Sequence, residues 1–178
     1  THDGNQLFNA GTRYDWYVLE KNKNTKLTKI KDELGDLLMI DLNKYNFLPN
    51  YSIEFINKLL KTDDEESINV IFNSSQYDGR RDWVADKKTD EFIYPLIHST
   101  PKTGPRFLYT NSKTPPVRNL VKMFDVPKII FGESGINDVI IDTDGVYGLT
   151  QGAIGIEVLN EDEAIIIKTA LETQLFKN

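Results

Sequence analysis

The stretch from Val126 to Ile156 constrains the fold of this chain more than any other part of the sequence. It contains three runs of apolar and β-branched residues, Lys128–Phe131, Val139–Asp142 and Thr150–Ile156, and glycine-bearing turns separate them. Short β-rich runs between glycine turns are typical of neighbouring strands. The sequence therefore predicts a small sheet with exposed loops in this region.

The two turns in this stretch are more easily explained by structure than by catalysis. Gly132-Glu133-Ser134-Gly135 is one residue short of the Gly-x-Ser-x-Gly elbow of serine hydrolases, so we predict a glycine turn between strands. Asp142-Thr143-Asp144-Gly145 starts like a calcium loop but lacks the third acidic ligand and the closing Glu. We therefore predict that Asp144-Gly145 forms a two-residue hairpin turn.

The first third of the chain predicts two strands and a helix. The polar opening, residues 1–12, reads as a connection from an upstream region, which suggests a piece of a longer protein. The strands are expected at Tyr14–Leu19 and Leu37–Leu42, and they are candidates to pair as a hairpin. A helix capped by Ser52 is expected to run to Lys61 and to place four apolar residues on one face: Ile53, Ile56, Leu59 and Leu60.

The remaining elements are three strands and a closing helix. Strands are predicted at Ile68–Phe72, Phe92–Ile97 and Phe107–Thr110, and Pro95 places the second at a sheet edge or a bulge. Asn160 with Glu163 three residues later resembles a capping box. The helix that follows should bury one face, composed of Ala164, Ile167, Leu171 and Leu175.

These elements together indicate an α+β fold, with a small strand-rich mixed sheet and two or more flanking helices. Residues 13–178 are long enough to form one domain, or two lobes over 13–75 and 90–178. The sequence has no cysteine and only two histidines, which excludes disulfides, thiolate zinc sites and histidine-rich metal sites. It shows neither a long apolar run nor a basic-then-apolar signal, so we expect a cytoplasmic protein that does not enter membranes.

Positive charge is concentrated in one segment of an otherwise acidic chain. The net charge is −6, which argues against a simple nucleic-acid binder. Residues 80–128, however, contain ten Lys or Arg against five acids, a balance of +5 that leaves −11 for the remainder. Such asymmetry can hold one face of a protein on DNA and turn the acidic face away, although a solvated mixed-charge surface explains it equally well.

The candidate DNA contacts come from this basic segment. Arginine forks can bind guanine or phosphate, asparagine can pair with adenine, and lysine suits phosphate as a point charge. The candidates are Arg80, Arg81, Lys102, Arg106, Asn111, Lys113, Arg118 and Lys128. Lys128 has an alternative role, which is to hold a neighbouring loop. Tyr77 and Trp83 are interpreted as satellite core residues.

The second half of the chain resembles the C-terminal target-recognition region of N6-adenine DNA methyltransferases, including fused restriction-modification enzymes of the Eco57I type. The matching parts are Pro127 to Phe131, the loop Gly132 to Gly135, Asp142 to Gly145, and Tyr147-Gly148. The resemblance implies that the chain reads the DNA sequence, while an upstream catalytic methyltransferase domain flips and methylates adenine with S-adenosylmethionine.

The catalytic motifs of that family are absent from this sequence. The only Pro-Pro pair lies in Thr114-Pro115-Pro116-Val117, which lacks the polar first residue and the aromatic fourth residue of the methyltransferase motif. No glycine-rich cofactor loop occurs, and Asp86-Lys87-Lys88 has no preceding Pro-Asp, as a nuclease of that class would need. We therefore expect duplex DNA as partner, and no cofactor or metal bound by this chain. A protein-interaction module and, with less support, a small hydrolase remain as alternatives.

Overall fold

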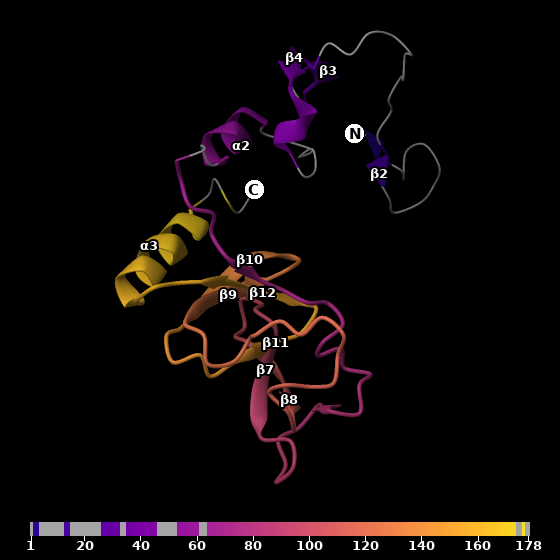
Figure 1. Ribbon diagram of the computed structural model, residues 1–178, viewed down its shortest axis with the longest axis vertical. Helices are drawn as coiled ribbons and strands as arrows, with labels where there is room; N and C mark the ends of the chain where they lie inside the picture. Colours follow the sequence, from indigo (N-terminus) through magenta and orange to yellow (C-terminus); the bar gives the residue numbers. More distant parts are fainter. Residues whose placement is uncertain are drawn as a thin grey trace. The chain divides into compact units, whose positions relative to one another are not determined.

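The computed structural model describes residues 2–3, 13–14, 26–32, 35–45, 53–60, 64–173 and 176. The chain divides into two compact units, Thr1–Glu66 and Ser67–Asn178. Figure 1 shows both units in the colours of the sequence.

The described residues of the first unit form two short antiparallel strand pairs and two helical segments. β1 (His2–Asp3) pairs with β2 (Arg13–Tyr14), and β3 (Thr28–Lys31) pairs with β4 (Leu37–Ile40). A 3-10 turn, η1 (Leu42–Lys44), and a short helix, α2 (Ile53–Leu59), follow.

The sequence predicted β4 and the helix of this unit, but not the partner of β4. That partner is β3, a four-residue strand just before it, and not the run beginning at Tyr14. The polar composition of β3 hides it, because three of its four residues are Thr or Lys. Of the predicted strand Tyr14–Leu19, all but Tyr14 lies outside the described residues, as do Ser52 and Lys61.

The second unit is built from two four-stranded sheets. The first sheet has the order β10-β9-β12-β5, in which all neighbours are antiparallel. Its strands are β5 (Val70–Ile71), β9 (Lys128–Gly132), β10 (Gly135–Asp142) and β12 (Ala153–Glu157). The second sheet is mixed, with the order β11-β7-β8-β6 and a parallel contact between β11 and β7. Its strands are β6 (Val84–Ala85), β7 (Tyr94–Ser99), β8 (Arg106–Thr110) and β11 (Gly148–Leu149).

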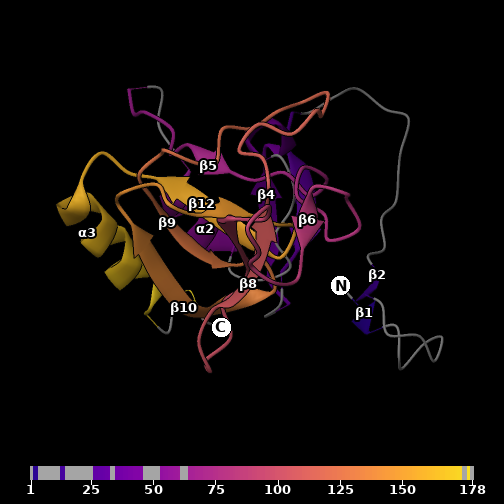
Figure 2. The same cartoon turned by 90° about the horizontal axis from the view of Figure 1, so that it is seen from below.

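The first sheet is the middle of three layers. Successive side chains of a strand point to opposite faces, so Ile129 packs with the closing helix α3 (Glu161–Leu171), whereas Ile130 joins the core shared with the second sheet. Figures 1 and 2 show α3 beside β9 and β10, and Figure 1 shows β7 and β8 away from it. An α+β fold with a strand-rich mixed sheet and flanking helices is therefore confirmed.

The closing helix begins as its capping pattern predicts. The Asn160 side chain accepts a hydrogen bond from the Glu163 backbone N–H at 2.9 Å, and the Glu163 carboxylate accepts one from the Leu159 N–H at 2.6 Å. Ala164 and Leu171 are buried in the layer below. Ile167 is partly buried there as well, while Leu175 lies outside the described residues.

Two expectations for turns and edges differ from the structure. Asp144-Gly145 does not form a hairpin, because β10 and the following β11 belong to different sheets. Pro95 lies on an internal strand, β7, and not on an edge strand, although the pairing of β7 with β8 does contain a register shift between Ile97 and Ser99. β11 begins opposite the residue after Pro95, so no neighbouring strand faces Pro95 on that side. The glycine turn at Gly132–Gly135 does join β9 to β10 as predicted.

A buried ion pair holds the crossing between the two sheets. Lys128 and Asp142 are opposite one another on β9 and β10, with Nζ and Oδ2 2.7 Å apart and side chains that are 0% and 2% exposed. The Asp142 carboxylate also accepts hydrogen bonds from the backbone N–H groups of Val146 (2.8 Å) and Tyr147 (3.0 Å), which lead into β11. Burial lowers the pKa of the Lys128 ammonium from its ordinary value, and Asp142 opposes that shift.

Asp142→Asn should destabilise the fold strongly at neutral pH, because it leaves the Lys128 charge buried without its counter-ion. Removal of one partner from a buried pair costs about 3–5 kcal/mol of unfolding free energy, measurable by urea denaturation. Lys113→Met is the matched control, since it breaks an exposed pair with Asp125 and should change stability far less. Equal denaturation midpoints for Asp142→Asn and the unaltered chain would contradict a structural role for this pair.

Candidate functional site

The structure places Lys128 away from any DNA-contacting surface. Its side chain is buried and donates to the Asp142 carboxylate and to the Val126 carbonyl at 3.1 Å. A buried ammonium with these partners cannot reach a phosphate, so its proposed DNA contact is corrected to the alternative role of holding a loop. The apolar strand that follows Lys128 gave no sign of which way its side chain points.

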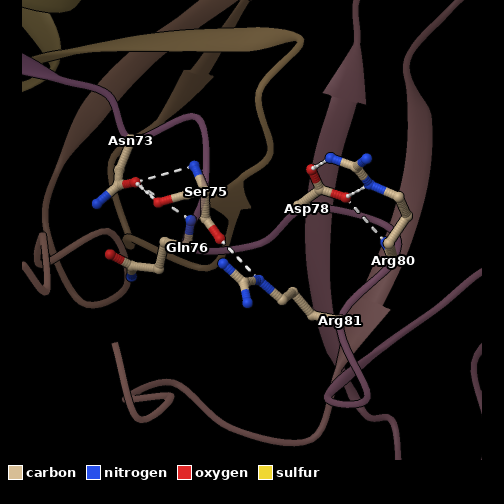
Figure 3. Close-up of polar contacts among 6 residues, drawn as sticks. All are labelled: Asn73, Ser75, Gln76, Asp78, Arg80 and Arg81. Carbon is tan, nitrogen blue, oxygen red and sulfur yellow. Dashed lines mark hydrogen bonds and ion pairs between the residues drawn. The ribbon is translucent and has the colours of Figure 1, made fainter. Parts of the chain in front are cut away.

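The neighbouring Arg80 and Arg81 have different surroundings, as Figure 3 shows. Arg80 forms a two-pronged ion pair with Asp78, with nitrogen–oxygen distances of 2.9 and 2.7 Å. This hydrogen bonding holds the pKa of the Asp78 carboxyl well below its ordinary value and raises that of Arg80. The Arg81 Nε instead donates to the Ser75 carbonyl at 3.2 Å, and its guanidinium carbon lies 5.4 Å from the centre of the Trp83 ring.

Two further candidates are engaged by other side chains. Lys113 pairs with Asp125 at 2.7 Å and lies near the rings of Tyr94 and Phe124, and its hydrogen bond lowers the pKa of Asp125. Asn111 donates its side-chain amide to Glu91 at 3.2 Å. Lysine and asparagine in these positions would have to give up protein partners before they could bind DNA.

Lys102 and Arg106 are available to a ligand. Both are exposed; Lys102 lies in the connection between β7 and β8, and Arg106 is the first residue of β8. The described residues offer neither side chain a hydrogen bond or an ion pair. Gly104 between them has a φ of +106°, a left-handed value that favours glycine and lets the chain turn back tightly.

Arg81 and Arg118 meet at one concave site. They line a partly open groove of about 380 Å³ that we call the arginine groove. Its lining residues are Asn73, Ser75, Arg81, Trp83, Pro116, Val117, Arg118 and Asn119. None of these residues is acidic, so the groove carries two positive charges in a chain whose net charge is −6.

One wall of the arginine groove is organised by the turn at residues 73–76. The Asn73 side-chain oxygen accepts hydrogen bonds from the backbone N–H groups of Ser75 (3.0 Å) and Gln76 (3.1 Å), which fixes the turn. Two carbonyls of the same turn accept hydrogen bonds in their turn. The Ser75 carbonyl accepts one from Arg81 Nε, and the Gln76 carbonyl accepts one from the Trp83 indole N–H at 2.9 Å. Both the Arg81 and the Trp83 side chains are therefore held by backbone acceptors.

The same turn also holds the second segment that lines the groove, residues 116–119. The Asn73 side-chain amide donates to the Asn119 carbonyl at 2.8 Å. The buried amide of Gln76 makes two hydrogen bonds with the backbone of Val121, donating to its carbonyl at 2.9 Å and accepting from its N–H at 2.8 Å. Arg118 lies just before this fastened stretch, so the turn sets the separation between the two arginine-bearing segments.

Tyr77 fastens residues 112–113, which lead into the second lining segment. Its ring is buried in the core between the sheets, and its hydroxyl lies 2.9 and 3.1 Å from the carbonyls of Lys113 and Ser112. Burial raises the pKa of the Tyr77 hydroxyl to about 12, against a smaller opposing effect of Gln76. The interpretation of Tyr77 as a core residue is confirmed, while Trp83 both packs against that core and lines the groove.

Sequence reasoning missed the residues that build the groove. Asn73, Gln76 and Asn119 were not candidates, because isolated polar residues in loops carry no local signal of a shared partner. The one usable hint was the Asn-Ser-Ser-Gln run at residues 73–76, since asparagine often fixes a turn through its own side chain.

Comparisons with protein families, with curated proteins and with solved structures find no match for this chain. Among the residues that the structure describes, no helix is long and apolar enough to cross a membrane. The same residues include no group of three or more acidic or histidine side chains that could hold a metal ion. The arginine groove is therefore the candidate site on its geometry alone.

Tyr77→Phe should remove a tyrosine ionisation that the folded chain delays to about pH 12, and it should loosen the chain that leads to residues 116–119. Because the folded-state pKa is raised from 10 to about 12, the stability that Tyr77 contributes is complete below pH 10 and is lost as pH rises through 12. The variant should lose about 1 kcal/mol of unfolding free energy at neutral pH, and tyrosinate absorbance should show one fewer late-titrating group. Tyr109→Phe on β8 is the control. An unchanged titration above pH 10 in Tyr77→Phe would refute the assignment.

Proposed function

We propose that this chain is the DNA sequence-recognition domain of an adenine-specific DNA methyltransferase or a fused restriction-modification enzyme. The observation that carries the proposal is the arginine groove, a concave site with two guanidinium groups and no acid in a chain of net negative charge. Guanidinium groups are the side chains best suited to phosphate and to guanine. The adenine-specific assignment rests on the resemblance in the second half of the chain.

In this proposal, four of the original candidates are retained as DNA contacts. Arg81 and Arg118 act in the groove, and Lys102 and Arg106 act on the β7–β8 connection. Arg80 and Lys113 contribute less, because Asp78 and Asp125 already neutralise them. Methyl transfer belongs to a catalytic domain outside this chain, which would bind S-adenosylmethionine and act on the flipped adenine.

A second candidate function is a protein-interaction module, favoured by exposed apolar residues along edge strand β5. Ile68, Val70 and Phe72 alternate along this edge and are 61%, 56% and 40% exposed. Val70 belongs to β5, and Ile68 and Phe72 flank it on either side; we call these three exposed residues the apolar strip. Salt separates the two functions, because DNA binding weakens steeply with salt whereas apolar docking does not.

Arg81→Ala and Arg118→Ala should each weaken binding of the full chain to a duplex pool of randomised sequence. Each change should lower the magnitude of the salt slope by about one unit if it removes a phosphate contact. Fluorescence anisotropy with labelled duplex at several salt concentrations measures both effects. Arg80→Ala is the matched control, since it removes an adjacent, exposed arginine whose charge Asp78 already balances.

The outcomes of this experiment separate the two functions. DNA binding that depends on Arg81 and Arg118 but not on Arg80 supports the proposed function. Absence of salt-dependent DNA binding in the unaltered chain would overturn it and leave the interaction module. In the parent enzyme, Arg106→Ala or Arg118→Ala should also relax discrimination at one base position by roughly 1–3 kcal/mol, whereas Lys102→Ala should weaken all sites alike.

A further inference from the structure

We propose that the arginine groove accepts one unpaired nucleotide, with its phosphate on the guanidinium groups and its base against the Arg81–Trp83 stack. This inference rests on the proposed DNA-binding function and specifies which form of nucleic acid the groove takes. A paired duplex would still contact the exposed Lys102 and Arg106. The distinguishing ligand is a nucleotide that protrudes from the helix.

The shape of the groove supports a protruding ligand. Its volume of about 380 Å³ falls within the range of small-molecule sites, and residues of two chain segments, within 73–83 and 116–119, line it. A base-paired duplex presents its bases inside the stack, so only phosphates on its convex surface could reach such a site. A single nucleotide turned out of the stack can present both phosphate and base.

The unengaged groups in the groove suit the two parts of a nucleotide. Arg118 and the side-chain amide of Asn119 have no hydrogen-bond partner among the described residues, although both line the groove. A guanidinium group binds phosphate with two parallel hydrogen bonds, and a side-chain amide can donate to and accept from the edge of a base. Uncharged ligands would leave both arginines unneutralised.

The other wall offers a prearranged stacking surface. The Arg81 guanidinium is fixed over the Trp83 ring by the Ser75 carbonyl, and the indole is fixed by the Gln76 carbonyl. Unpaired bases stack on aromatic rings and on guanidinium planes with little dependence on sequence. Because both side chains are already held, little conformational freedom is lost when a base stacks there.

The test compares three labelled duplexes that share the same flanking sequence. One is fully paired, one carries a single-nucleotide bulge, and one carries a bulge that lacks a base. The sequence contains two tryptophans, so Trp16→Phe leaves Trp83 as the sole indole reporter. The bulged duplex should bind the full chain about fivefold or more tighter than the paired duplex and quench Trp83 fluorescence. The base-free bulge should lose the quenching and most of the added affinity.

Matched variants keep the test decisive. Arg118→Ala should abolish the preference for the bulge, whereas Arg80→Ala should preserve it. If Trp16→Phe does not fold, loss of bulge-induced quenching in Trp83→Phe would also show that the bulged base contacts Trp83. Equal binding of bulged and paired duplexes, still dependent on Arg81 and Arg118, would overturn this inference and leave the proposed function standing. Absence of salt-dependent binding to all three duplexes would overturn both.

Discussion

The irregular segment between β8 and β9 depends on hydrogen bonds from side chains, and the rest of the second unit depends on that segment. Residues 111–127 contain no helix or strand, yet they bring Met123, Phe124 and Val126 into the core between the sheets. Backbone polar groups in such a segment need partners that secondary structure does not supply. Asn73, Gln76 and Tyr77 supply several of them. One short stretch of chain therefore fixes both the core and the groove.

The residues that carry the family resemblance prove to be structural. Lys128 and Asp142 pair in the interior, and Gly145 lies where an added Cβ would come within 2.4 Å of the Val126 nitrogen. A buried ion pair is often no more stabilising than apolar residues of the same volume, but its geometric demands can select one arrangement of strands. We infer that this motif specifies how the chain crosses between sheets. Any recognition chemistry would lie in loops outside it.

Local signals in the sequence predict the positions of helices and strands better than they predict which strands pair. Capping by Asn160 and Glu163 marks the closing helix because the interacting groups are three residues apart. The turn at Asp144-Gly145 misleads, since turn chemistry records a local bend but not the sheet to which the next strand belongs. The mixed second sheet arises from pairing between β7 and β11, whose partner residues, such as Leu96 and Gly148, are 52 positions apart in the sequence.

The candidate site shows the same division between local and distant information. Residue type is sufficient to nominate Arg81 and Arg118, because guanidinium chemistry belongs to the side chain itself. It does not separate them from Arg80, which Asp78 neutralises, or from Lys128, which Asp142 buries. Those differences come from neighbours in space. A binding surface is in this sense the set of charges that the fold has left without a counter-ion.

The pairing of β5 with β12 has a consequence for how the protein is made. β5 is the first strand of the second unit and β12 is its last, so the first sheet cannot close before residue 157 has left the ribosome. Topologies dominated by such distant contacts fold slowly, because the chain loses the entropy of closing long loops before the contacts contribute favourable free energy. During synthesis the unpaired edge of β5 and the side chain of Ile71, which is buried in the finished fold, would remain open to association with other chains. The same sheet topology therefore leaves the nascent chain open to association until synthesis of β12 is complete.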